Sequence, residues 1–590
     1  MSCIKHSLWI LVLIGGISCG PDVPVEEREN SPLQALFDEA WEFRLREDPV
    51  FATSIGRHEY NDRLASVALP DLERRVQFWR DVLVRLDGFD VNSLTAPDRL
   101  NYDLFRLQVE DRIKSFEFKE YLMPLTAEAG FHTSFAFLPQ NIPFQTTRDY
   151  QNYISRLEAF GEITDQQILH LTSALEEGYA LPGEVLEGYQ GTIQAHVVSN
   201  LDDSVFMVPF QDFPEGVSEG DRTTLLAKGR HALATGVIPA YQRFLTFFLD
   251  RYQPEARPSL GASELPNGEA YYRYLIRLHT TLDLNAEEVH QIGLGEVSRL
   301  QSEMQQVLDT VGFQGDLPSF IRSLRTDSRF YAKTGEQLLK EAAWIAKTMD
   351  GKLPALFKNL PRRPYTVEAV PDHIAPKYTA GRYVGAPQGS TRPGIYWVNT
   401  YALESRPLYS LTALTLHEAV PGHHLQNALR LELEDLPDFR RYSGVNAYGE
   451  GWGLYSEWLG LEAGFYTDPY DNFGRLTYEM WRACRLVVDT GLHSKGWSRQ
   501  QAIDFMAANT ALSLHEIGTE TDRYISWPGQ ALAYKMGELK IKELRRRAES
   551  ILQSNFDVRE FHNEILRHGP LPLTQLEEQV DLWIQEAAAR

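Results

Sequence analysis

The sequence is poor in cysteine and in positive charge. Only 3 of its 590 residues are cysteines, too few to cross-link a chain of this length, so a hydrophobic core must stabilise the fold. Lysine and arginine number 58 against 81 aspartates and glutamates, which gives a net charge of −23. This deficit of cations argues against nucleic acid as a partner, because a nucleic-acid-binding surface must neutralise phosphates.

Long hydrophobic runs are also missing. The apolar stretch at residues 8–14 (LWILVLI) is far too short to span a bilayer, which takes about 20 apolar residues. It follows a basic start and precedes small residues, so residues 1–18 are predicted to be a secretory signal peptide. Cys19 is then the predicted lipidation site of a bacterial lipoprotein, although Gly16 stands where that signal usually has leucine. An ordinary signal peptide followed by a chance cysteine is the alternative.

The segment after the predicted lipidation site has the composition of a tether. Residues 19–30 are mostly polar and contain proline. The sequence therefore predicts an exported protein, anchored in the bacterial envelope through a lipid at Cys19. Gly20, where an aspartate would favour the inner membrane, points to the periplasmic face of the outer membrane.

From about residue 31 the hydrophobic pattern is mostly helical. Apolar residues recur at three- and four-residue spacing in segments 71–86, 98–116, 148–178, 222–252, 268–282, 286–311 and 336–348. Asn285, followed closely by two glutamates, predicts a helix N-cap. Segments 365–370 and 394–400 are rich in β-branched and aromatic residues and predict strands. The sequence thus predicts one mainly α body with a small sheet just before its most unusual segment.

That segment is residues 416–426 (LHEAVPGHHLQ), which places three histidines and one glutamate within eight residues. In the His-Glu-x-x-His helix of zinc peptidases, two histidines four residues apart bind zinc and the glutamate is the general base. Here the second histidine position is Pro421, which cannot donate the helical hydrogen bond to residue 417. Pro421 and Gly422 are predicted to form a kink or bulge that brings His423 into the second-ligand place.

The second histidine ligand has an alternative. His424 shares a helix face with His417, but seven residues rise about 10.5 Å, a long reach for one shared ion. We therefore favour His423 as the ligand and expect His424 to support it or to contact the substrate. Glu450, 33 residues after His417, is the predicted third metal ligand.

Two further glutamates complete the predicted site. Glu457 lies seven residues after Glu450, on the same helix face, and could orient a ligand histidine. Glu418 is the predicted general base. The alternative is that Glu450 only caps a helix and that His423 and His424 are surface residues.

Several separated motifs carry a resemblance to a known family. The region from about residue 30 to 580 resembles the bacterial family called domain of unknown function 885, whose members are often lipoproteins. The matching motifs, in order, lie at 417–424, 450–457, 482–493, 523–524, 528–537 and 561–573. That family is in turn similar to helical zinc peptidases such as thimet oligopeptidase and carboxypeptidase Taq, although these carry an uninterrupted His-Glu-x-x-His.

The resemblance implies a fold and its divisions. It implies a mainly α, two-lobed, zincin-like clam with a small antiparallel sheet beside the cleft. The metallopeptidase-like domain would span 31–580, with a helical lobe at about 31–360 and a catalytic lobe at about 361–580.

The predicted function is that of a zinc-dependent peptidase acting on short peptides. Zinc held by His417, His423 and Glu450 would lower the pKa of a bound water, and Glu418 would take its proton. The oxyanion then needs a hydrogen-bond donor. The candidate donors are Tyr534, Tyr524 and His493, of which His493 could equally be a buried structural residue.

Substrate-binding residues are predicted from charge and from sheet edges. Arg482, Arg485 and Arg523 could bind a substrate carboxylate, or could pair with nearby acids. Asn399 follows a predicted strand that could bind an extended substrate. Two other functions fit the same sequence: a non-catalytic envelope protein with a peptide-binding cleft, and a metal-dependent hydrolase of another amide.

Overall fold

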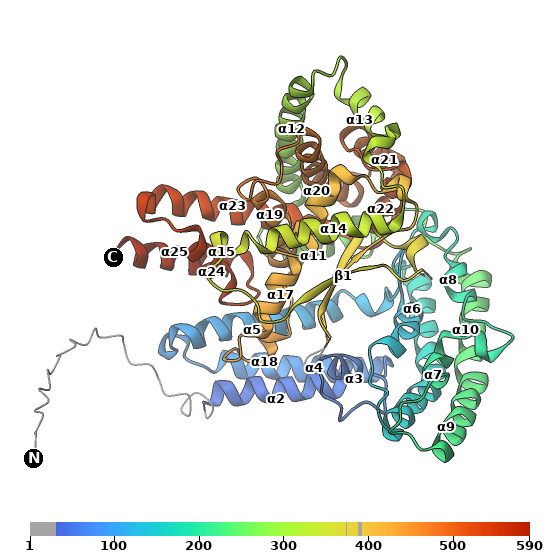
Figure 1. The fold of residues 1–590 in the computed structure, drawn as a ribbon. Helices are drawn as coiled ribbons and strands as arrows, with labels where there is room; N and C mark the ends of the chain where they lie inside the picture. The colour runs from blue at the N-terminus through green and yellow to red at the C-terminus, as the bar shows by residue number, and fades with distance from the viewer. Residues whose placement is uncertain (1–30, 373, 387–391, 590) are drawn as a thin grey trace, which may run out of the picture.

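The computed structural model describes residues 31–372, 374–386 and 392–589. The predicted signal peptide, Cys19 and the tether lie outside these ranges. The described chain is mainly helical, as predicted, and includes one small sheet (Figure 1). None of its helices is long and apolar enough to cross a membrane.

The chain forms helices both before and after the three-stranded sheet. Before the sheet they are α2 (Pro32–Glu47), α3 (Pro49–Ser54), α4 (Leu69–Asp87), α5 (Ala96–Glu117), α6 (Phe131–Ala136), α7 (Thr147–Glu177), α8 (Gln190–Gln194), α9 (Glu219–Ala232), α10 (Ile238–Phe247), α11 (Gly268–Thr280), α12 (Ala286–Val311), α13 (Leu317–Thr326), α14 (Gly335–Asp350) and α15 (Leu353–Leu356). After it they are α16 (Leu411–Glu418), α17 (His423–Leu431), α18 (Asp438–Arg441), α19 (Asn446–Leu459), α20 (Pro469–Ser494), α21 (Arg499–Asn509), α22 (Leu514–Ser526), α23 (Ala533–Leu552), α24 (Val558–Leu566) and α25 (Leu573–Ala588).

The predicted helical segments coincide within a few residues with observed helices. α12 also begins as its sequence predicts: the Asn285 side chain accepts a hydrogen bond from the Glu288 N–H at 3.0 Å, and the Glu288 carboxylate accepts one from the Asn285 N–H at 2.8 Å. This reciprocal cap satisfies backbone N–H groups that would otherwise lack partners. Local sequence therefore sets these helix limits.

The sheet differs from the prediction in two respects. Its strands β1 (Tyr365–Ala369), β2 (Gly381–Val384) and β3 (Gly394–Val398) have the order β1-β3-β2. β1 pairs with β3 in parallel and β2 pairs with β3 antiparallel, so the sheet is mixed and not antiparallel. β3, the strand predicted to be an edge, is central. The edge beside α16 is β2, which the sequence analysis missed.

Two large hydrophobic clusters form most of the core. One combines α7, α10, α12 and α20; the other combines α2, α4, α5, α19, α23 and α25. Each cluster contains residues from both sides of residue 360, so the two predicted lobes share their cores, and the division into lobes stays a prediction. α16 contributes Leu414 to the first cluster and Leu416 to the second. The histidine motif therefore lies at the junction of the two cores.

Candidate metal centre

The helix that carries the histidine motif is fully interrupted. α16 ends at Glu418 and α17 begins at His423, so the predicted kink is a complete break. The buried Trp452 indole donates a hydrogen bond to the Pro421 carbonyl at 2.8 Å and so fixes the connection. A Cβ on Gly422 would lie 1.9 Å from the His417 carbonyl oxygen, so only glycine fits where α17 starts.

This break brings two imidazoles and one carboxylate together. Glu450, on α19, places its Oε2 atom 3.5 Å from Nε2 of His417 and 3.4 Å from Nε2 of His423. One ligand atom from each of the three residues lies within 4.8 Å of the others. Zinc bonds of about 2.1 Å in tetrahedral geometry separate neighbouring ligand atoms by about 3.4 Å. The predicted convergence is confirmed and its spacing fits zinc; metal binding itself stays a prediction.

The charges in this cluster favour a cation between them. Burial disfavours a charged His417, but hydrogen bonds with Glu450 and Glu457 outweigh it and raise the pKa of His417 to about 10. Burial would raise the pKa of Glu450, yet the two imidazoles hold that pKa well below its usual range. A divalent metal would take the place of the proton, because a histidine ligand must be neutral.

Glu457 orients the His417 ring through the nitrogen that does not face Glu450. Its Oε1 atom lies 2.8 Å from Nδ1 of His417, and its side chain is almost completely buried. A carboxylate can only accept, so Nδ1 carries the hydrogen and Nε2 keeps its lone pair for a metal. Nη2 of Arg482 lies 3.4 Å from the same Glu457 oxygen. Arg482 therefore neutralises this carboxylate and is not free to bind a substrate.

Gly453 lets α19 approach the His417 ring. It lies one turn after Glu450, and a Cβ there would be 2.6 Å from Cε1 and 2.7 Å from Nε2 of His417. Gly453 is not among the site residues predicted from the sequence. The signal was present, since Glu450, Gly453 and Glu457 share one face of a helix.

We expect Gly453→Ala to push the His417 ring away from Glu450. Overpacking of this kind costs roughly 1–3 kcal/mol, and zinc affinity should fall with it. Gly449→Ala, in the same helix, is the matched control, because a Cβ there would lie 3.9 Å from Oε1 of Gln426, at an ordinary contact distance. Thermal denaturation and zinc titration of both variants test this; equal zinc affinities would show that the glycine has no role in ligand placement.

Glu418 and His424 both contact the edge strand. The Glu418 carboxylate accepts a hydrogen bond from the Tyr383 N–H at 2.8 Å. His424 is buried, with Nε2 3.1 Å from the Arg363 carbonyl and Nδ1 3.4 Å from the Tyr383 hydroxyl. Burial lowers the pKa of His424 to about 4. His424 is thus not the second metal ligand, and it packs against the strand that holds Glu418.

Two of the three predicted oxyanion donors, His493 and Tyr524, are occupied elsewhere. Both His493 nitrogens pair with backbone, Nδ1 accepting from the Ala262 N–H at 3.0 Å and Nε2 donating to the Tyr524 carbonyl at 2.9 Å. The Tyr524 hydroxyl lies 2.8 Å from Nε of Arg485 and 2.9 Å from the Trp481 indole nitrogen. The Tyr524 hydroxyl also hydrogen-bonds the Glu520 carboxylate, so neither His493 nor Tyr524 is free to stabilise an oxyanion.

Asn399 is also structural. It is fully buried at the end of the central strand, and its Nδ2 atom lies 2.9–3.1 Å from the carbonyl oxygens of Ala375, Tyr378 and Thr379. Its Oδ1 atom accepts from the Tyr401 N–H at 3.0 Å. The predicted contact with an extended substrate is therefore wrong, because Asn399 is saturated and its strand is not an edge.

The remaining arginines have acidic partners. Arg485 and Arg523 both contact Oε2 of Glu520, at 3.0 and 3.4 Å. Tyr534 lies beside them, with its ring centroid 4.4 Å from the Arg485 guanidinium carbon. Its hydroxyl makes no hydrogen bond within the described part of the chain, so Tyr534 stays the available predicted donor.

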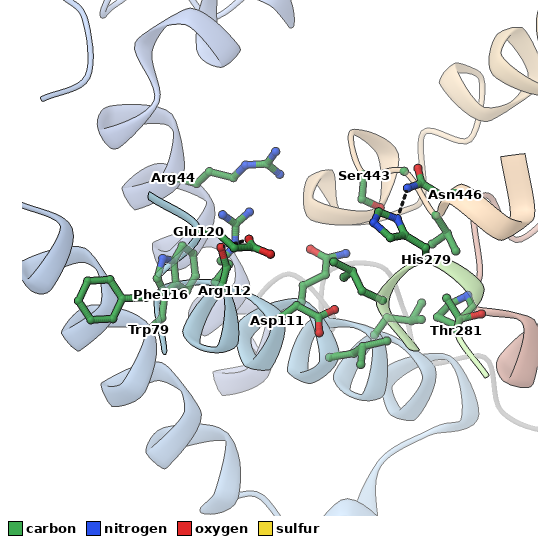
Figure 2. Close-up of a pocket in the computed structure, with 18 of the residues that line it drawn as sticks. Arg44, Trp79, Asp111, Arg112, Phe116, Glu120, His279, Thr281, Ser443 and Asn446 are labelled. Atoms are coloured by element: carbon green, nitrogen blue, oxygen red, sulfur yellow. Dashed lines mark hydrogen bonds between the residues drawn. The ribbon is translucent and has the colours of Figure 1, made fainter. Parts of the chain in front are cut away.

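A small cavity opens beside the cluster. It has a volume of about 160 Å³ and is lined by His423, Glu450 and Arg430, among others. Arg430 lies two turns after His423 on α17, and the sequence analysis missed it. The residues at 444–446 and Pro570 also line a second cavity of about 620 Å³, shown in Figure 2.

Comparisons with known proteins give a family but no activity. A family model described as a bacterial protein of unknown function, DUF885, matches residues 49–580. A candidate lipoprotein from Colwellia psychrerythraea has a solved structure with 28% sequence identity and a TM-score of 0.88, covering 94% of this chain and 99% of that one. A candidate lipoprotein of unknown function from Shewanella oneidensis shares the fold at 17% identity and a TM-score of 0.70, covering 93% and 99%.

No curated protein sequence matches the chain. The predicted similarity to zinc peptidases is not tested by these comparisons and stays a prediction. The match over residues 49–580 confirms the family that the sequence motifs indicated. The chain belongs to the DUF885 family of bacterial proteins.

Proposed function

We propose that this chain is a zinc-dependent peptidase that hydrolyses short peptides. The observation that carries the proposal is the spacing of 3.4 and 3.5 Å between Glu450 and the two histidine Nε2 atoms. The Glu457 carboxylate behind His417 adds support, because it presents the metal-binding nitrogen in the correct tautomer. Zinc bound there would polarise a substrate carbonyl and acidify a water.

The protein's own groups would perform the proton transfers. Glu418 would take the proton of the attacking water and pass it to the leaving amine. Its hydrogen bond with the Tyr383 N–H fixes one carboxylate oxygen and leaves the other for this task. The hydroxyl of Tyr534 would donate to the oxyanion.

We further propose that a lipid at Cys19 holds this peptidase at the periplasmic face of the outer membrane. The two solved relatives described as candidate lipoproteins support an envelope location. The polar residues 19–30 would separate the lipid from the folded body that begins at α2.

The zinc content and peptidase activity of the purified mature chain test the proposed function directly. We expect about one zinc per chain after gentle purification, and cleavage of short peptides that chelator abolishes and added zinc restores. A chain without metal or cleavage that still binds peptides would support the non-catalytic alternative. Zinc-dependent cleavage restricted to other amides would replace the peptidase proposal with the second alternative.

A further inference from the structure

The 620 Å³ cavity next to the metal centre is basic. It lies mainly between α4, α5, α11 and the loop before α19 (Figure 2). Four arginines and two carboxylates line it, in a chain whose net charge is −23. A local excess of positive charge in an acidic protein concentrates anions at that place.

Three of these arginines make no ion pair with another described residue, and Arg440 among them donates to neutral oxygens. The side chains of the other two, Arg44 on α2 and Arg112 on α5, make no hydrogen bond to the described residues either. Asp48 acts on both through its charge, and each of the two lies over an aromatic ring. The Arg44 guanidinium carbon is 3.8 Å from the Phe51 ring centroid, and that of Arg112 is 4.8 Å from the Trp79 centroid. Figure 2 shows both arginines at the end of the cavity away from His279 and Asn446.

The two guanidinium groups repel each other. Burial, together with the charge of Arg112, lowers the pKa of Arg44 to about 10. Burial also lowers the pKa of Arg112. An anion bound between them would relieve this repulsion and could accept hydrogen bonds from both.

The other charged groups of the cavity are already engaged. Arg75 pairs with Glu47 at 3.0 Å, Arg440 donates to Asn101 at 2.8 Å, Asp111 pairs with Arg277 at 3.1 Å, and Glu120 accepts from the hydroxyls of Tyr271 and Ser115. Among the described residues, Arg44 and Arg112 are therefore the arginines of this cavity whose side-chain N–H groups are without a hydrogen-bond partner, and Asp48 offsets their charge without a hydrogen bond. By contrast, the three arginines that the sequence suggested for a substrate carboxylate face Glu457 or Glu520.

The cavity that holds this arginine pair shares lining residues with the small cavity beside the metal centre. Asn446 lines both cavities, pairs with His279 at 2.8 Å and lies one helical turn before Glu450. Along α5 the wall runs from Leu104 to Phe116, a rise of about 18 Å. An extended peptide covers about 3.4 Å per residue, so about five residues would span that wall.

We propose that Arg44 and Arg112 bind the carboxylate of a short peptide substrate whose other end reaches the metal centre. This inference rests on the proposed function for the role of the bound peptide. The carboxylate can be the C-terminal group or an acidic side chain at that end, and the experiment separates these sources.

The test measures binding by calorimetry to the zinc-loaded chain carrying Glu418→Gln, which prevents turnover. The probes are penta-alanine with a free C terminus, its C-terminal amide, and the amide with glutamate as the last residue. We expect the free acid to bind 10- to 100-fold more tightly than the amide. Whether the glutamate peptide amide regains this affinity tells whether a side chain can supply the carboxylate.

Arginine variants show which residues cause the preference for the free acid over the amide. Arg44→Gln and Arg112→Gln should each remove most of the acid-to-amide preference, and Arg112→Lys should keep part of it. Arg75→Gln is the matched control, because it lines the same cavity but pairs with Glu47, and it should leave the preference unchanged. Equal binding of acid and amide, or a preference that survives both glutamine variants, would overturn the proposal.

The outcomes also separate the two proposals. If peptides bind through their carboxylate but the wild-type chain cleaves none of them, the peptidase proposal is wrong and the carboxylate site is supported. If the chain cleaves peptides but shows no preference for a carboxylate, the peptidase proposal is supported and the carboxylate site is wrong. Binding of inorganic phosphate at this pair, with no binding of peptide, would show a site for free anions and contradict the inference.

Discussion

The Glu418→Gln variant is expected to keep its zinc and to lose peptide turnover by roughly 10²- to 10⁴-fold, the range that a general base contributes. A glutamine oxygen can still accept the hydrogen bond from the Tyr383 N–H, so the local structure should survive. The amide cannot take the proton of the attacking water. The measurement is kcat at equal zinc content for variant and wild type.

A surface glutamate provides the control for this variant. Glu434 is exposed in the turn after α17, and Glu434→Gln should leave kcat within a factor of two, on the order of the usual effect of a surface change. A Glu418→Gln chain with wild-type kcat would remove Glu418 from the mechanism, whatever the metal content.

The second large effect concerns metal binding. We propose three protein ligands for zinc, and each of the variants His417→Ala, His423→Ala and Glu450→Ala removes one of them. We therefore expect zinc to be lost on dialysis. Glu457→Gln should keep the ligands but weaken zinc binding 10- to 100-fold, because its carboxylate only orients His417. The measurements are zinc content by mass spectrometry and the zinc-dependent rise in Tm, which ligand variants should lack.

A variant of His424 serves as a control for the assignment of His423 as the second metal ligand. His424→Asn changes the residue next to His423, but its side chain pairs with the Arg363 carbonyl and Tyr383. It should therefore retain zinc even if the protein is less stable. Loss of zinc in His424→Asn with retention in His423→Ala would reverse the assignment of the second ligand.

The sequence predicts those features that depend on local pattern. The helices and the Asn285 cap follow from periodicity and side-chain chemistry within a few residues. The break between α16 and α17 follows from Pro421, because proline cannot donate a helical hydrogen bond. The seven-residue spacing of Glu450 and Glu457 places both on one helix face, which is why Glu457 is predicted to orient a ligand histidine beside Glu450.

The features that the sequence did not reveal depend on distant contacts. β2 has four residues and no clear alternation, and it is a strand because it pairs with β3. Arg485 and Glu520 are 35 residues apart and meet only when α20 packs on α22. Arg44 and Arg112 lie on separate helices, and nothing local indicates that they share one cavity wall.

The central claim is that His417, His423 and Glu450 bind one zinc ion. The most direct test is anomalous X-ray diffraction at the zinc absorption edge from crystals of the zinc-loaded chain. We predict one strong peak about 2.0–2.2 Å from Nε2 of both histidines and from a Glu450 carboxylate oxygen. A stoichiometric zinc bound elsewhere, or no peak among these three side chains, would contradict the account.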